Sequence, residues 1–350
     1  MQQTHLLKQV VKVFRKNRDL DSLKAVRQKS GSAGLPGDIK DELKLGNNAT
    51  CASPEFQFVA GTTWVFASQE MRECPVDVLV VDEAGQMSLA DTLAASLSAH
   101  NLLLIGDPLQ LPQVTQASHP GNSGRSVLEH ILGEEKTMPA ERGIFLPESR
   151  RMHPDVCDFI SEQIYEGRLE SYPACRQQST VAGTGLRWMR AEHSNNTTSS
   201  PEEADLVVAE VQRLMGTTWT THDGNKKPLR PKDFVVVTPY NDQRRLLQDR
   251  LEAHPETIGV DVGTVDKFQG QEAAVVFFSM ATSSGDNVVH GKDFLFSRNR
   301  LNVAISRARC LAYLVCTEDL LDTRARSVDE MRLIATLNAF VEHVKNARPN

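Results

Sequence analysis

The chain lacks features that would assign it to several other classes of protein. No apolar run approaches the roughly 20 residues that cross a bilayer, and Lys8, Lys12 and Arg15 interrupt the N-terminal stretch where a signal peptide carries an apolar block. The six cysteines include no Cys-x-x-Cys pair and lie mostly in apolar segments, where a reduced thiol acts as a small hydrophobe. We therefore expect a cytoplasmic protein without a membrane partner, a disulfide framework or a zinc site.

A phosphate-binding loop is also missing. Such a loop reads Gly, four residues, Gly-Lys and Ser or Thr, and its backbone amides and lysine hold the phosphates of a nucleotide. The glycine cluster of residues 31–37 is followed by Asp38 where lysine is required, which favours a linker. The run 285–292 has five intervening residues and is followed by Asp293 instead of a hydroxyl residue. The sequence thus predicts a chain that begins downstream of this loop.

The length and charge set wide bounds. The chain has 350 residues, 40% hydrophobic and 24% charged, enough for roughly two globular domains of about 150 residues each. Its formal net charge of -6 argues against a globally basic nucleic-acid binder. A protein can nevertheless confine its positive charge to one groove, so the net charge leaves nucleic-acid binding open.

Two series of short apolar runs predict two α/β units. In the first, residues 76–81 and 102–105, preceded by residues 58–59, are typical of strands buried on both faces in a parallel sheet that helices flank. The second series covers residues 234–237, 262–265, 274–278 and 311–315. We expect a partial helical and linker segment at 1–55, an incomplete first domain at 56–147 and a second domain at 148–350.

Helix signals accompany these runs. Ser200, a following proline and Glu203 combine an N-cap, a first-turn proline and a capping-box glutamate ahead of an apolar stripe. Ser327 and Glu330 repeat the capping-box pattern before a C-terminal amphipathic helix. Apolar residues also recur at helical spacing over residues 6–14.

Polar groups suited to phosphate chemistry follow two strands of the first unit. Asp82 and Glu83 come directly after the run 76–81, at the sheet edge where α/β proteins bind ligands. In a nucleotide hydrolase the first would hold Mg²⁺ and the second would polarise water. In an ordinary sheet two acidic residues only mark the point where a strand reaches solvent. Gln110, in the turn 106–114, would lie beside them and hydrogen-bond a γ-phosphate and the attacking water. Both strand ends together favour nucleotide chemistry.

Arginines and a loop of small residues complete the series. Arg150-Arg151-Met152-His153-Pro154 opens the second unit, and Ser306-Arg307-Ala308-Arg309 lies near its end. Phosphoryl transfer depends on neutralising charge, and a finger arginine is worth about 10³ to 10⁵ in rate. Taken singly, each of these arginines is more often a member of a surface ion pair than a finger. Residues 263–272 permit close approach of a ligand, with Glu272 in reach of ribose or phosphates.

In order and wording these elements resemble superfamily 1 helicases of the 5′-to-3′ type. The match runs from about Phe58 to the C-terminus and covers Asp82–Gly85, Gly106–Pro112, Arg151–Pro154, Thr264–Glu272 and Arg300–Arg309. The stretches 61–64, 183–188 and 293–300 are similar to the helicase half of bacterial proteins that fuse a RecB-like nuclease to such a motor. The resemblance implies an α/β fold of two RecA-like domains, the first incomplete, with ATP and Mg²⁺ as cofactors. It implies single-stranded DNA as partner, with RNA as the alternative, and a nuclease domain or a chain segment that supplies the missing loop.

The resemblance also implies residue roles by position. Asp82 would bind Mg²⁺, Glu83 would activate water, Gln110 would sense the γ-phosphate, and Arg151 and Arg307 would act as fingers. Nucleotide contacts are implied for Asp107, Arg150, Gly270, Glu272 and Arg309. Nucleic-acid contacts are implied for Thr62, Thr63, Thr238, Pro239, Tyr240 and Thr264. Gln243 matches a family position as well, either as a contact or as support for its loop.

One residue departs from the family pattern. Where the family has an aromatic residue before the first finger arginine, this chain has Arg150, whose guanidinium plane can also stack on a base.

Two functions from different classes follow. The first is part of an ATP-dependent 5′-to-3′ DNA helicase, an enzyme by family, which couples ATP hydrolysis to translocation and is inactive alone for lack of the loop. The second is a non-enzymatic nucleic-acid-binding remnant or regulatory module. Nucleotide-dependent changes in nucleic-acid affinity would distinguish them.

Overall fold

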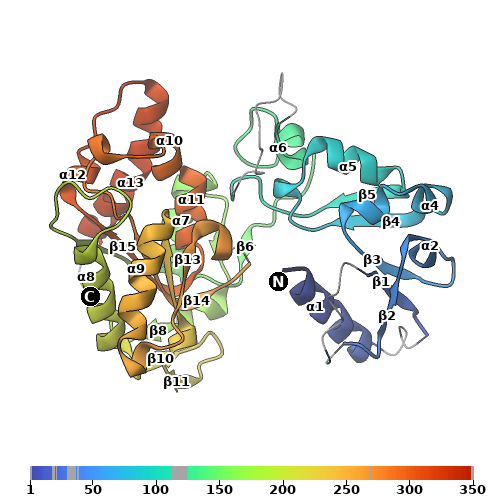
Figure 1. The fold of residues 1–350 in the computed structure, drawn as a ribbon, viewed down its shortest axis with the longest axis horizontal. Coiled ribbons are helices and arrows are strands. Elements are labelled where there is room, and N and C mark those ends of the chain that lie inside the picture. Colours follow the sequence, from blue (N-terminus) through green and yellow to red (C-terminus); the bar gives the residue numbers. More distant parts are fainter. Residues whose placement is uncertain are drawn as a thin grey trace. The chain divides into compact units, whose positions relative to one another are not determined.

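The computed structural model describes residues 2–17, 20, 22–29, 37, 39–111, 124–268 and 270–347. The chain divides into two compact units, one of residues 1–108 and 112–133 and the other of residues 109–111 and 134–350 (Figure 1). Residues 134–147, which the motifs assign to the first domain, group with the second unit. The linker expected at 30–38, apart from Gly37, and the motif residues 112–114 lie outside the described residues.

A three-stranded parallel sheet opens the first unit. Its order is β2-β1-β3, with β1 (Ala25–Gln28) between β2 (Leu43–Gly46) and β3 (Phe58–Ala60). The predicted N-terminal helix is confirmed as α1 (Gln2–Lys16), which buries Leu7 and Val11 against this sheet. The sequence missed β1 and β2 because four-residue strands with polar members show no clear alternation.

The second sheet of this unit pairs β4 (Val76–Val81) with β5 (Ala99–Leu104) in parallel. The helices of the unit are α2 (Asn48–Cys51), α3 (Thr63–Phe66), α4 (Gln69–Glu73), α5 (Leu89–Ser96) and α6 (Val127–Leu132). Leu79 and Val81 are buried in the core that these helices share. The prediction that β4 is buried on both faces was wrong, because Val78 and Val80 remain 51% and 53% exposed. The helices cover one face of the two strands and leave these valines on the other.

The second unit is built on a five-stranded parallel sheet in the order β13-β12-β14-β15-β9. Its strands are β9 (Gly185–Arg190), β12 (Phe234–Thr238), β13 (Asp261–Thr264), β14 (Ala273–Ser279) and β15 (Ala308–Cys316). Every residue of β12 and β14 is buried, as expected of central strands in a parallel sheet. The four predicted runs of this unit are thereby confirmed as strands.

Helices cover both faces of this sheet. One core joins it to α7 (Pro154–Ile164), α11 (Arg298–Ile305) and α13 (Val328–Asn346), and the other joins it to α8 (Pro201–Leu214) and α9 (Asn241–Glu252). The predicted caps are present, since Ser200 Oγ accepts from the backbone N–H of Glu203 and Ser327 Oγ from that of Glu330. The short helices are α10 (Lys292–Leu295) and α12 (Glu318–Leu321).

Smaller sheets complete the second unit. An antiparallel sheet has the order β11-β10-β8, formed by β8 (Ser179–Thr180), β10 (Thr218–Thr220) and β11 (Lys226–Pro228). Two-residue strands β6 (Glu148–Ser149) and β7 (Glu170–Ser171) pair in parallel. Within the described part of the chain, no helix combines the length and apolar character that a membrane span requires.

Candidate nucleotide and nucleic-acid site

Asp82 and Glu83 follow β4 directly and form a strained acidic turn. Asp82 is exposed, and its Oδ1 accepts a hydrogen bond from the backbone N–H of Glu83 at 3.1 Å. The Glu83 backbone has φ 56° and ψ 39°, a left-handed conformation that costs a non-glycine residue about 1–2 kcal/mol. Strain of this kind gathers at functional sites.

Two glycines let the turns after β4 and β5 approach closely. A Cβ on Gly85 would lie 2.6 Å from the carbonyl oxygen of Asp107, and one on Gly106 would lie 2.8 Å from the backbone nitrogen of Ala84. That nitrogen donates to the carbonyl of Ile105 at 2.8 Å. Asp107, for which a nucleotide contact is predicted, therefore lies beside the acidic turn.

The donors of this turn fit Mg²⁺. This hard cation keeps several waters and binds through one or two carboxylates together with substrate phosphates. Asp82 offers an exposed carboxylate of that kind at the carboxyl edge of the sheet. Among the residues that the structure describes, no group of three or more His, Cys, Asp or Glu side chains could cage a metal. The geometry suits an ion shared with a nucleotide.

Gln110 and Arg307 meet inside the second unit. Arg307 is 2% exposed, and its Nη2 donates to Gln110 Oε1 at 3.4 Å. Its other guanidinium nitrogens donate to the carbonyls of Val303 and Gln271 at 3.1 and 3.3 Å. Asn299 Nδ2 donates to the carbonyl of Gln110 at 2.5 Å. Gln110 thus groups with the second unit, and its predicted place beside Asp82 and Glu83 stays a prediction.

Glu272 forms ion pairs with two of the predicted arginines, Arg151 and Arg309. Its Oε2 lies 3.0 Å from Nε of Arg151, and its Oε1 pairs with Arg309. Arg151 also donates to the carbonyl of Ser306 at 3.0 Å. Burial raises the pKa of Glu272, but hydrogen bonds and charge attraction from Arg309 and Arg151 outweigh it, so the pKa lies below its ordinary value. The cluster keeps one positive charge in excess, which suits an anionic ligand.

Arg150, the residue that departs from the family pattern, stacks on an aromatic ring of its own chain. Its guanidinium lies 4.8 Å from the ring centroid of Tyr172, and its Nε pairs with Glu148 at 2.9 Å. The side chain is 75% exposed, so the outer face of the guanidinium is open to solvent. Stacking of Arg150 on a base stays a prediction.

The predicted nucleic-acid residues of the second unit are more buried than surface contacts would be. Thr238 is 0% and Tyr240 3% exposed, and burial raises the pKa of the Tyr240 hydroxyl, which meets Thr282 Oγ1 at 3.4 Å. Pro239 is buried and Thr264 half-buried. Contacts from these positions would therefore come largely from backbone groups at the strand ends, which hold phosphates without reading sequence.

Three further predicted positions, Thr62, Thr63 and Gly270, lie at or close to a glycine. Thr62 and Thr63 begin α3 in the first unit and are half-buried. Gly270 has φ 76°, a conformation that favours glycine, while Gln269 lies outside the described residues.

Gln243 and Glu203, which the sequence reasoning named separately, belong to one buried polar network that it did not predict. Gln243, fully buried, donates to Ser279 Oγ at 2.9 Å and accepts from the backbone N–H of Ser200 at 2.7 Å. Ser279 Oγ donates to Glu203 Oε2 at 2.6 Å, and Glu203 Oε1 lies 3.1 Å from Nε2 of His193. The side chain of Gln243 is thus engaged by Ser200 and Ser279, and the choice between a nucleic-acid contact and loop support stays a prediction. In the sequence Glu203 was recognised only as a helix-capping residue, and a capping pattern carries no information about burial.

Parallel sheets, with Asp82 and Glu83 directly after β4, have the arrangement in which α/β proteins bind ligands at the carboxyl ends of their strands. Two protein-family models, both described as AAA domain, match residues 39–118 and 123–319. The second covers more than half of the chain, so the chain belongs to the AAA domain family.

Curated relatives agree with the resemblance to superfamily 1 helicases. DNA-binding protein SMUBP-2 of Mesocricetus auratus is 30% identical over 76% of this chain and 27% of its own length. Helicase sen1 of Schizosaccharomyces pombe is 30% identical over 70% of this chain and 15% of its own length. DNA replication ATP-dependent helicase/nuclease DNA2 of Gallus gallus is 27% identical over 67% of this chain and 22% of its own length. The chain thus spans about a quarter or less of the length of these relatives.

Among solved structures, a complex of Arterivirus nonstructural protein 10 (helicase) with DNA is similar to this chain. The match covers 89% of this chain and 51% of that chain, at 17% identity and a TM-score of 0.44. The fold assignment rests on the strand order and helical layers of each unit.

Proposed function

We propose that this chain is part of an ATP-dependent 5′-to-3′ helicase of superfamily 1 that couples ATP hydrolysis to movement along single-stranded DNA. The observation that carries the proposal is the contact of Arg307 with Gln110. It joins the predicted finger to the predicted γ-phosphate sensor. RNA is the alternative strand. A RecB-like nuclease region, or a segment that supplies a phosphate-binding loop, would be the partner.

The residues divide the chemistry between them. Asp82 would hold Mg²⁺, which supplies charge neutralisation to the phosphates when bound. Glu83 would take the proton of the attacking water, and Gln110 would orient that water. Arg307 and Arg151 would neutralise charge on the transferred phosphoryl group, with Arg309, Arg150, Asp107, Gly270 and Glu272 around the nucleotide. Thr62, Thr63, Thr238, Pro239, Tyr240 and Thr264 would line the path of the strand.

The proposal includes low activity for these 350 residues alone, since they contain no Gly-x-x-x-x-Gly-Lys-Ser/Thr string. Steady-state ATPase turnover with and without single-stranded DNA tests this. Turnover near that of family members, abolished by Glu83→Gln, would contradict the inactivity and leave the helicase assignment in place. Absence of any single-strand binding would contradict the assignment itself.

A second function is favoured by the ion pairs of Glu272, which already engage Arg151 and Arg309. In that case the chain is a nucleic-acid-binding module without hydrolysis. Its affinity for single strands would fall with salt, as counterion release requires, and would not change with ATP or with Arg307→Ala. Any nucleotide-dependent change in affinity would favour the helicase.

A further inference from the structure

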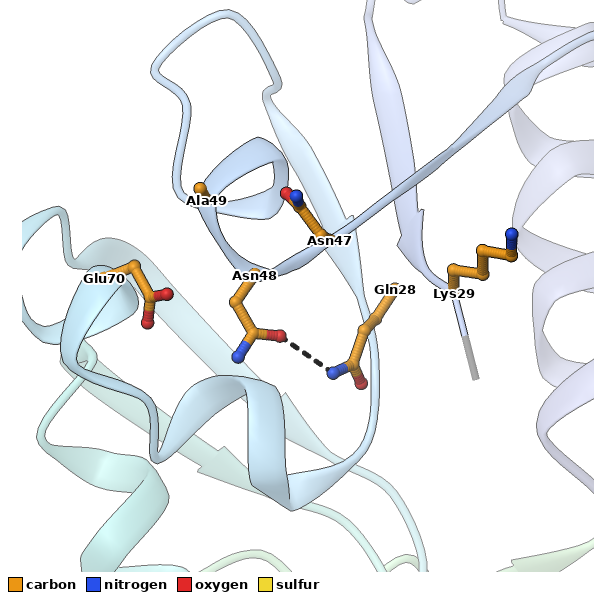
Figure 2. Close-up of a pocket in the computed structure, with 6 residues that line it drawn as sticks. All are labelled: Gln28, Lys29, Asn47, Asn48, Ala49 and Glu70. Atoms are coloured by element: carbon orange, nitrogen blue, oxygen red, sulfur yellow. Dashed lines mark hydrogen bonds between the residues drawn. The ribbon is translucent and has the colours of Figure 1, made fainter. Parts of the chain in front are cut away.

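A polar pocket of about 370 Å³ lies in the first unit, where β2, β1 and β3 end (Figure 2). Its lining residues are Gln28, Lys29, Asn47, Asn48, Ala49 and Glu70. The carboxyl ends of parallel strands are the usual place for ligands in α/β proteins. None of the roles assigned above uses this pocket.

The amide oxygens of the pocket are engaged by the protein. Gln28 Nε2 donates to Asn48 Oδ1 at 2.9 Å, the bond drawn in Figure 2, and Thr62 Oγ1 donates to Gln28 Oε1 at 3.2 Å. Asn47 Oδ1 accepts from the backbone and the hydroxyl of Thr50, each at 2.9 Å. Within the described part of the chain, the side-chain N–H groups of Asn47 and Asn48 have no protein acceptor. The pocket therefore offers amide donors.

Glu70 adds a carboxylate, which accepts hydrogen bonds, to the amide donors of the pocket. Its exposed carboxylate, from α4, lies on the Asn48 side of the pocket, whereas the Lys29 side chain extends away from Asn48 (Figure 2). A phosphate at the Asn48 amide would meet the negative charge of Glu70. A ligand that accepts from the amide and donates to the carboxylate satisfies both groups.

We propose that this pocket receives a nucleobase with an exocyclic amino group beside a ring nitrogen acceptor, as in cytosine or adenine. The amino group would donate to Glu70, and the ring nitrogen would accept from Asn48 Nδ2. Uracil and thymine place a carbonyl oxygen where the amino group stands, and that oxygen would face the carboxylate. The inference rests on the nucleic-acid binding proposed above, because Thr62 links the strand path to Gln28.

The test compares the affinity of the whole 350-residue chain for labelled oligo(dC) and oligo(dU) of equal length by fluorescence anisotropy. These strands differ in the 4-amino against the 4-oxo group and in the proton on N3. Paired base contacts discriminate by about 1–3 kcal/mol, so we expect about tenfold tighter binding of oligo(dC). Asn48→Ala and Glu70→Ala should each bring the ratio close to one.

Glu73→Ala is the matched control, since Glu73 lies on the same helix, accepts from Gln69 and does not line the pocket. It should keep the wild-type ratio, and thermal melting should show each variant folded. Equal binding of the two strands by the wild type, or a ratio that survives Asn48→Ala and Glu70→Ala, would overturn the inference alone. No binding of either strand would overturn the proposed function with it.

Discussion

Arg307 donates from Nη2 to Oε1 of Gln110 at 3.4 Å, which joins the last motif of the series to the turn that follows β5. Because Arg307 is nearly fully buried and also donates to two backbone carbonyls, the protein itself fixes the direction of its guanidinium. A shift of Gln110 relative to Arg307 would therefore break this hydrogen bond, because the guanidinium cannot follow it without losing its other two bonds.

Arg307→Ala should lower the free energy of unfolding by about 2–4 kcal/mol, because the carbonyls of Val303 and Gln271 lose a charged donor in a buried place. Urea denaturation followed by circular dichroism measures this. Arg332→Ala, at a side chain 78% exposed, is the control and should change stability by less than about 0.5 kcal/mol. Equal effects of the two substitutions would show that Arg307 is not held as described.

Glu83→Gly should be more stable than Glu83→Ala by about 1 kcal/mol. Both remove the carboxylate, but only glycine relieves the left-handed backbone at φ 56°. Thermal unfolding of the two variants isolates the backbone contribution from the loss of the side chain. If alanine proved as stable as glycine, the turn would not carry the strain assigned to it.

Glu203→Gln should cost about 2–3 kcal/mol. The fully buried carboxylate accepts from Ser279 Oγ and from the backbone N–H of Ala281, both at Oε2. Each of these bonds weakens by about 1 kcal/mol when a neutral amide oxygen replaces the charged carboxylate. Asp205→Asn removes an exposed carboxylate on the same helix, which pairs with Arg250 at 3.1 Å, and should be nearly neutral. Chemical denaturation of both variants compares them, and a harmless Glu203→Gln would refute the role of the network.

The Glu272 cluster predicts a pH dependence. The pKa of Glu272 is depressed in the folded protein, so its contribution to stability is present above the ordinary carboxyl pKa and is lost as pH falls through the folded value. Wild type should therefore lose more stability than Glu272→Gln between neutral pH and about pH 3. Denaturation curves over that range measure the difference, and parallel curves would contradict it.

The strands of the second unit could be predicted because burial on both faces leaves an unbroken apolar run. Residues 234–237 and 274–278 are such runs, and both became central strands. The same pattern wrongly predicted burial of Val78 and Val80, because the helices of the first unit pack on only one face of β4. An apolar run reports that a strand can be buried, and packing partners decide whether it is.

For the site, the sequence was informative where a residue suited to phosphate chemistry follows the end of a predicted strand. Asp82 and Gln110 could be named in this way, whereas Arg307, which precedes β15, could be named only from the resemblance. Their roles stay predictions. Asn299 and Asn302 could not be named, because a helix asparagine reveals nothing of the carbonyls of Gln110 and Leu109 to which these side chains donate.

The sequence by itself determined the motif order, the strand runs, the caps of α8 and α13, and the absence of a Gly-x-x-x-x-Gly-Lys-Ser/Thr string from these 350 residues. These are local properties, set by spacing and by residue type. The tertiary structure alone decided that Gln110 contacts Arg307 and that Gln28, Asn48 and Glu70 share one pocket. Such contacts join residues far apart along the chain, and only the packing of strands and helices brings them within hydrogen-bonding distance.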